Sequence, residues 1–182
     1  MRAVRWEDWA GRGLQHVVLS ERADVILAEA VCIVAEDGGY AARYRIDCDR
    51  GWRCRSLDVE IIGTARTLRL RGDASGRWTD GDGTPLPALD GAIDIDLPIT
   101  PFTNTLPIRR LALAAGAWAE LDVVYVRTPA LSVELDRQRY VCLAPLRRYR
   151  YEAVDGSFTA ELDVDDAGLV LTYPGLFRRR SS

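Results

Sequence analysis

Hydrophobic and polar residues alternate along most of this chain, and turn residues interrupt the alternation at short intervals. Because successive side chains of a strand point to opposite faces, a period of two predicts half-buried β-strands. Turns are expected at Asp155-Gly156 and at 166–168, where glycine supplies the backbone freedom that a tight turn needs. The predicted strands are 14–20, 25–34, 40–47, 52–62, 67–71, 92–97, 121–127, 131–143, 147–153, 158–164 and 169–173.

One segment departs from this rhythm. Asn104 and Thr105 can cap the start of a helix, and Pro107 suits a first turn, where its missing N–H costs nothing. The pattern predicts one short helix near residues 105–115, running from Ile108 to Ala114 and ended by Gly116. The five residues from Arg178 to Ser182 are expected to form a frayed tail.

Strands this frequent, without alternating helices, favour a mainly β protein. We expect a single large antiparallel sheet that is curled into a partly closed barrel. No repeat or linker divides the sequence, and its 182 residues suit one domain over 1–182.

Composition narrows the class of protein. Apolar residues make up 48% of the chain and charged residues 28%, as in soluble globular domains. No apolar run is long enough to span a bilayer, and charged residues stand where a secretory signal would be apolar. We therefore expect a cytoplasmic protein without a transmembrane segment. The net charge of −3 argues against nucleic acid as a partner.

All 24 basic residues are arginines, and His16 is the single histidine. The absence of lysine excludes a Schiff-base lysine and a phosphate-loop lysine, and one histidine excludes a site with several histidine ligands. No cysteine lies in a C-x-x-C pair, so neither a metal nor a cofactor is expected. The thiols are expected to be buried; they belong to Cys32, Cys48, Cys54 and Cys142.

Two pairs of arginines fall in step with apolar residues. Arg53 and Arg55 share strand parity with Leu57, and Arg137 and Arg139 share it with the apolar residues on either side of them. An unpaired buried guanidinium is very costly. Three interpretations follow: a bulge or turn shifts the register, a buried ion pair forms, or these arginines line a partly hydrated cavity and meet a ligand.

Two other pairs of polar side chains each share one strand face. Asp94 and Asp96 are natural partners for arginine, and their i, i+2 spacing is also compatible with the acid–base pair of a glycosidase. Tyr149 and Tyr151 form an amphipathic surface that suits a sugar ring or a lipid chain, as well as the edge of a core.

Several longer segments carry a family resemblance. They include WRCRSLDVE at 52–60, PFTNTLPIRR at 101–110, QRYVCL at 138–143 and RYRYE at 148–152. With these segments the chain resembles, over nearly its whole length, a bacterial glycolipid-binding family. That family's fold is similar to the periplasmic lipoprotein carrier and its outer-membrane receptor, in which an antiparallel sheet curls around a hydrophobic cavity.

The resemblance implies no catalytic or metal-binding set, but it implies ligand-binding positions. These are Trp52, Arg53, Arg55, Asp94, Asp96, Asn104, Arg109, Arg110, Arg139, Tyr140, Tyr149 and Tyr151.

The sequence therefore favours a lipid- or glycolipid-binding protein over an enzyme. An amphiphile would lie in the concave face of the sheet, with arginines holding an anionic or hydroxylated head group through bidentate hydrogen bonds. Two alternatives remain open. One is a structural or protein-interaction β domain without a small ligand, and the other is a carboxylate-dependent enzyme acting on a sugar.

Overall fold

The computed structural model describes residues 1–36 and 38–180, and within them one 14-stranded sheet contains the strands. The strands are β1 (Arg2–Asp8), β2 (Leu14–Glu21), β3 (Ile26–Val34), β4 (Tyr40–Cys48), β5 (Cys54–Ile61), β6 (Thr67–Gly72), β7 (Trp78–Asp80), β8 (Asp94–Asp96), β9 (Trp118–Arg127), β10 (Ser132–Ala144), β11 (Arg148–Ala153), β12 (Thr159–Val164), β13 (Val170–Tyr173) and β14 (Phe177–Arg180). The helices are the short 3₁₀ turns η1 (Pro87–Leu89) and η2 (Pro101–Asn104) and the α-helix α1 (Thr105–Leu111).

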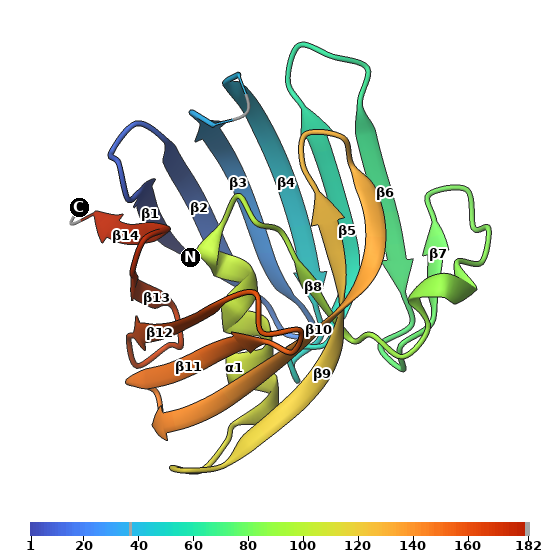
Figure 1. Cartoon of the computed structure of the whole chain (residues 1–182). Coiled ribbons are helices and arrows are strands. Elements are labelled where there is room, and N and C mark those ends of the chain that lie inside the picture. The colour runs from blue at the N-terminus through green and yellow to red at the C-terminus, as the bar shows by residue number, and fades with distance from the viewer. Residues whose placement is uncertain (37, 181–182) are drawn as a thin grey trace.

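The strand order joins the two ends of the chain in the middle of the sheet. It runs from β7 back to β1, passes directly to β14, and continues back to β8. The prediction of a mainly β chain with one large curled sheet and one short helix is confirmed (Figure 1). The sheet is mixed rather than wholly antiparallel because β8 runs parallel to β9, and it is not closed, since β7 and β8 are its two edges.

The helix α1 lies between the two halves of the curled sheet, β1–β7 on one side and β9–β14 on the other (Figure 1). Its Leu106 belongs to the larger apolar cluster, which is built mainly on the first half. Its Ile108 belongs to the smaller cluster, which is built on β10–β13. One short helix thus contributes to both cores, which accounts for the burial of 101–108.

Several predicted boundaries are corrected by the structure. The helix occupies Thr105–Leu111 rather than Ile108 to Ala114, and it ends at Ala112 in a left-handed conformation rather than at Gly116. Arg178 to Arg180 belong to strand β14 instead of a frayed tail, while 181–182 lie outside the described residues. Strands β1 and β7 were not predicted from the pattern.

A β-bulge accounts for the first pair of arginines that fall in step with apolar residues, Arg53 and Arg55. Cys48 pairs with Cys54 whereas Asp47 pairs with Ser56, so Arg55 is an extra residue between two ladder positions. The register shift turns Arg55 to solvent although Leu57 is buried. The bulge interpretation is therefore confirmed for this strand.

The second pair has a different cause. The ladder between β9 and β10 is continuous from Ser132 to Val141, without a bulge. Near its start β10 packs Val133 against the larger cluster, whereas farther along it buries Tyr140, of the opposite parity, in the smaller one. Because the buried face changes along this long strand, Arg137 is exposed.

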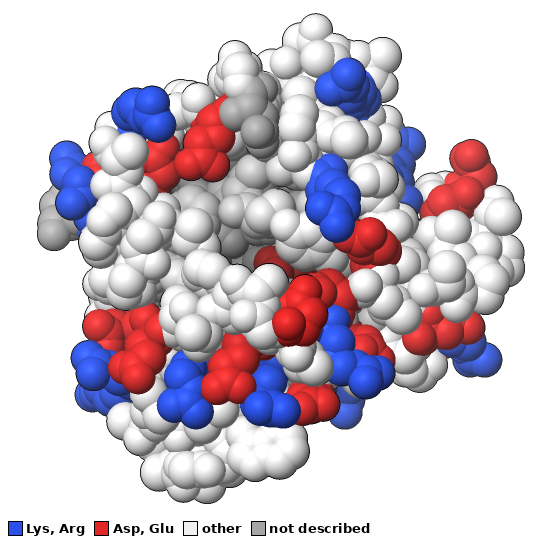
Figure 2. All heavy atoms as spheres, in the orientation of Figure 1, with Lys and Arg blue, Asp and Glu red and all other residues white. Residues whose placement is uncertain are grey.

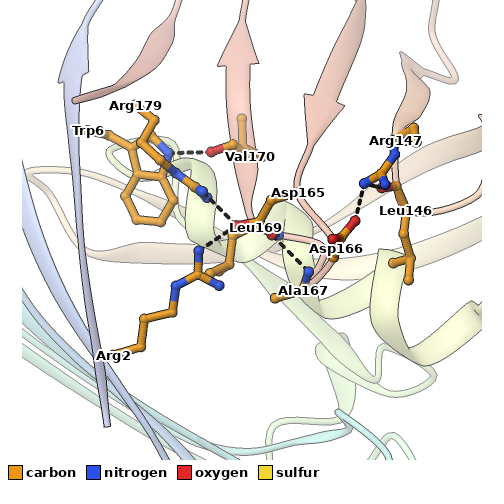
Figure 3. A network of polar contacts seen from close by, with 10 residues as sticks. All are labelled: Arg2, Trp6, Leu146, Arg147, Asp165, Asp166, Ala167, Leu169, Val170 and Arg179. Carbon is orange, nitrogen blue, oxygen red and sulfur yellow. Dashed lines mark hydrogen bonds and ion pairs between the residues drawn. The ribbon is translucent and has the colours of Figure 1, made fainter. Parts of the chain in front are cut away.

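Polar contacts fasten the junction between the chain ends (Figure 3). Arg2 of β1 and Arg179 of β14 each donate to Oδ2 of Asp165, at 2.6 Å. The guanidinium of Arg179 also lies 5.5 Å from the centre of the Trp6 ring, whose Nε1 donates to the Val170 carbonyl at 2.8 Å. These contacts link β1 and β14 to the β12–β13 turn.

Candidate functional site

A hollow made of two adjoining compartments opens in the curled sheet. The aliphatic compartment, of about 450 Å³, is lined largely by apolar side chains, among them Leu14, Ile33 and Leu176. The carboxylate compartment, of about 470 Å³, contains a set of acidic and aromatic side chains. The two share part of their lining, including Tyr125 and Arg127, and so adjoin each other. Figure 2 shows a depression in this region with acidic side chains along its lower edge.

The walls of the aliphatic compartment come from both halves of the sheet, near the junction of β1 with β14. Leu14 begins β2 and Ile33 lies near the end of β3, while Leu176 occupies the turn between β13 and β14. All three are at least 40% exposed, unlike core residues of the same type. Exposed apolar side chains that gather around a hollow suit contact with hydrocarbon.

The carboxylate compartment is organised around Gln138 of β10, which is 1% exposed. Its Nε2 donates to Oδ2 of Asp96 at 2.8 Å and to Oδ2 of Asp136 at 3.1 Å. Thr103 donates its hydroxyl to Oδ1 of Asp96 at 3.0 Å. One amide thus holds two carboxylates close together at the wall of the hollow.

Burial raises the pKa of Asp96, an effect that the hydrogen bonds from Gln138 and Thr103 only partly offset and that the charge of Asp136 reinforces. Among the described residues, neither Asp96 nor Asp136 has an arginine within ion-pair distance. The compartment therefore holds carboxylates whose charge the protein itself leaves uncompensated.

Aromatic rings also line the carboxylate compartment. The ring centre of Tyr151 lies 6.0 Å from that of Phe158 and 6.4 Å from that of Tyr173, and Phe158 and Tyr173 are 6.1 Å apart. Tyr140 packs edge-on against Tyr151 from behind at 5.6 Å and donates its hydroxyl to Asn104 Oδ1 at 2.9 Å. Because these rings pack against one another, the orientation of their faces and edges beside the carboxylates is fixed.

Three of the predicted site residues line the hollow: Asp96, Asn104 and Tyr151. Asp94 does not, because it is buried in an ion pair whose shortest distance, to Arg110 Nη2, is 2.5 Å. Burial raises the pKa of Asp94 and the Arg110 guanidinium opposes that shift. The pair fastens β8 to α1, so Asp94 and Asp96, although neighbours on one strand, have different surroundings.

The structure gathers another group of predicted residues at the β4–β5 turn. Arg109 of α1 lies over the ring of Trp52 at 5.3 Å. Arg53 and Arg55 both approach Asp49, at 3.9 and 3.7 Å. None of these side chains is in the lining of the hollow.

The remaining predicted residues lie on the second half of the sheet. Tyr149 is buried in the smaller cluster and its hydroxyl accepts a hydrogen bond from the Leu146 N–H at 3.2 Å. Arg139 lies on the outer face between Glu120, at 2.5 Å, and Glu152, at 3.1 Å. Figure 2 shows the alternating charges of this face across β10–β12.

The sequence pattern missed several residues that line the hollow: Tyr125, Arg127, Asp136, Phe158 and Tyr173. Asp136 and the buried Gln138 are polar residues at i, i+2 on one face of a strand, which is the signal that could have drawn attention to them. The rings come from separate strands, and no spacing along the chain relates them.

Two further observations concern other kinds of site. Within 1–36 and 38–180, no three histidine, cysteine or acidic side chains are placed to hold a metal ion. In the same ranges no helix has the length and apolar character that crossing a membrane requires.

Comparisons with known proteins agree with the resemblance seen in the sequence. The family described as "Putative glycolipid-binding" matches residues 3–179. A crystal structure of a DUF1089 family protein from Pseudomonas aeruginosa is 42% identical, with a TM-score of 0.79 over 91% of this chain and 92% of the other. No curated protein matches the chain. Because the match spans nearly every residue, the chain belongs to the family described as "Putative glycolipid-binding".

Proposed function

We propose that this protein binds a glycolipid-like amphiphile in the hollow. The hydrocarbon part occupies the aliphatic compartment and the sugar head group occupies the carboxylate compartment. The observation that carries the proposal is the direct adjacency of two compartments, one with exposed aliphatic side chains and the other with a set of carboxylates and aromatic rings. Each is within the size range of small-ligand pockets, roughly 300–1,000 Å³.

The lining of the carboxylate compartment suits a sugar. Aromatic rings such as Phe158 and Tyr173 offer apolar faces to the C–H groups of a pyranose ring. The carboxylates of Asp96 and Asp136 accept hydrogen bonds from hydroxyl groups. A hollow that is open to ligand also supports binding over the alternative of a filled protein-interaction domain.

The arginine that is placed to contact the head group is Arg127, which lines both compartments and pairs with Glu134 at 2.5 Å. Arg53, Arg55 and Arg139 face carboxylates elsewhere on the molecule. Since acidic side chains outnumber this single arginine in the lining, the compartment favours a hydroxylated head group over an anionic one.

The proposal is tested by titrating the protein with an alkyl glucoside below its micellar concentration, with the parent alcohol and free glucose as comparisons. Only the intact glucoside is expected to give saturable binding in calorimetry and a one-to-one complex in native mass spectrometry. At a hundredfold excess over Kd, binding adds about 2.7 kcal/mol to the free energy of unfolding, which raises the melting temperature.

Two variants locate the site. Phe158→Ser removes an exposed ring of the compartment and should weaken glucoside binding by about tenfold, since burying a phenyl group contributes roughly 1.5–3 kcal/mol. Trp118→Ser removes a more exposed ring on the outer face and should leave binding unchanged. An unshifted melting temperature with no complex, or equal losses in both variants, would overturn the proposal.

One observation favours a second candidate function. The raised pKa of Asp96 beside Asp136 is the arrangement that a carboxylate-dependent hydrolase of glycosides needs. Incubating the protein with a panel of 4-nitrophenyl glycosides measures this activity directly. Release of nitrophenol that Asp96→Asn abolishes would establish an enzyme, whereas absence of release at high enzyme concentration would exclude hydrolysis of these glycosides.

A further inference from the structure

The carboxylate compartment has an unusual charge balance. Asp96, Asp136 and Asp155 line it without an arginine partner among the described residues. Arg127, the cation in the lining, is bound to a fourth carboxylate, that of Glu134. Arginines neutralise many carboxylates elsewhere in the molecule, so this wall retains a net negative charge.

The Asp96–Asp136 pair lies where a ligand would meet it. Gln138 holds both carboxylates through one amide nitrogen, at 2.8 and 3.1 Å, so their Oδ2 atoms are neighbours. A buried amide can hold this geometry, but it carries no charge to offset theirs. A cation beside the two oxygen atoms would supply the missing compensation.

The aromatic wall favours the same kind of ligand. Tyr151, Phe158 and Tyr173 form a contiguous cluster, and Tyr125 lines the same compartment. The negative face of an aromatic ring attracts ammonium groups, most strongly where water is excluded. Rings combined with carboxylates are typical of sites that recognise amines.

An independent observation comes from Gln15 of β2, which lines the aliphatic compartment and is 3% exposed. Its Oε1 has no hydrogen-bond donor among the described residues. An unsatisfied buried acceptor is costly, and a ligand that brings N–H or O–H groups relieves that cost. Gln15 thus adds an unsatisfied acceptor beside a compartment whose carboxylates lack an arginine partner.

We propose that the head group of the bound amphiphile carries a protonated amine, as in an amino sugar, and that this ammonium lies between Asp96 and Asp136. This inference rests on the proposed function and specifies the chemistry of its head group. The hydroxyls of the same sugar are available to the other acceptors, and the hydrocarbon remains in the aliphatic compartment.

The test compares two ligands that differ at one position of the sugar: an alkyl glucosaminide, which carries an ammonium group there, and the corresponding alkyl N-acetylglucosaminide, which carries a neutral acetamide. An alkyl glucoside serves as a third ligand without a nitrogen substituent. Calorimetric titrations at neutral pH and fixed salt are expected to show the amine binding at least about tenfold more tightly than either neutral glycoside, because the ammonium makes charge-assisted hydrogen bonds.

Variants assign that preference to the carboxylates. Asp96→Asn and Asp136→Asn should each reduce the amine-to-neutral affinity ratio to below about threefold, because each removes a charge from the pair. If Asp96→Asn does not fold, Asp136→Asn still tests the preference for the amine. Asp122→Asn changes a carboxylate that is paired with Arg137 on the outer face and should preserve the ratio.

The outcomes separate the two proposals. Equal affinity for the amine and the neutral glycosides, or an unchanged ratio in the Asp96 and Asp136 variants, overturns this inference and leaves glycolipid binding intact. Absence of binding by all three ligands overturns both.

Discussion

Asp165 shows how much one carboxylate contributes where the chain ends meet. It accepts hydrogen bonds from Arg2 and Arg179 through Oδ2 and from the N–H groups of Ala167 and Leu169 through Oδ1 (Figure 3). Its side chain is 18% exposed, whereas that of Asp166, which pairs with Arg147, is 83% exposed. Adjacent residues of one turn therefore form a largely buried and a solvated ion pair.

Asp165→Asn keeps the acceptor for the turn and removes the charge that faces both arginines. We expect it to lower the free energy of unfolding by about 2–3 kcal/mol, because a largely buried guanidinium loses its partner. Asp166→Asn should change it by less than about 0.5 kcal/mol. Urea denaturation of the two variants measures both values, and equal effects would contradict this role of Asp165.

The stability that the Asp165 carboxylate contributes depends on pH in a defined way. Burial opposes ionisation of Asp165, but the hydrogen bonds from Arg179, the Leu169 N–H and Arg2 outweigh it and hold its pKa below the ordinary value. A lowered folded-state pKa stabilises the protein above the unfolded value, about 3.9, and this contribution is lost as the pH falls. The difference between wild type and Asp165→Asn should therefore be constant above about pH 5 and shrink below pH 4.

The sequence pattern identified the unusual charged residues, but it did not predict what surrounds each of them in the fold. The parity of Arg55 and Arg139 marked both as exceptional, yet a bulge turns one to solvent and a change of buried face exposes the other. Asp96 and Tyr151 were predicted site residues that do line the hollow. Tyr125 and Tyr173 meet there only because the sheet curls, and a one-dimensional pattern contains no such information.

At the scale of elements, the end of α1 shows why a helix boundary was misplaced. The sequence suggested Gly116, since glycine commonly ends a helix, but Ala112 takes the left-handed position with φ = 44°. The helix also begins earlier than predicted, because η2 leads directly into α1 and Thr100 accepts a hydrogen bond from the Phe102 N–H at 3.2 Å. Burial of Leu106 between the sheet halves then sets the position of the helix.

Ala112→Gly should stabilise the protein. A left-handed conformation costs a residue with a Cβ roughly 1–2 kcal/mol, whereas glycine loses about 0.5–1 kcal/mol through greater freedom of the unfolded chain. We expect a net gain of about 0.5 kcal/mol in the free energy of unfolding. Ala114→Gly, at an exposed position without positive φ, should be neutral or destabilising. Thermal melts of the pair measure the difference, and a loss at Ala112 would contradict the strain argument.

At the scale of the whole molecule, the topology predicts one cooperative unit over 1–182. The strands β1 and β14 form a ladder of paired residues in the middle of the sheet, which makes the two halves continuous. The helix α1 contributes Leu106 to one apolar cluster and Ile108 to the other. Opening either half would therefore expose part of the core that the other half uses.

The four buried cysteines provide a direct measurement of that cooperativity. Cys32, Cys48 and Cys54 lie in the larger cluster and Cys142 lies in the smaller one. If the halves unfold together, a pulse of thiol reagent at increasing urea concentrations will label all four at one midpoint, because each thiol is protected by the same global equilibrium. Peptide mapping resolves the sites, and Ser157→Cys, in an exposed turn, gives the labelling of an unprotected thiol at every urea concentration. Labelling of Cys142 at a lower urea midpoint than the other three would show instead that the second half of the sheet opens by itself. The hollow would then lose its aromatic side chains before the larger core unfolds.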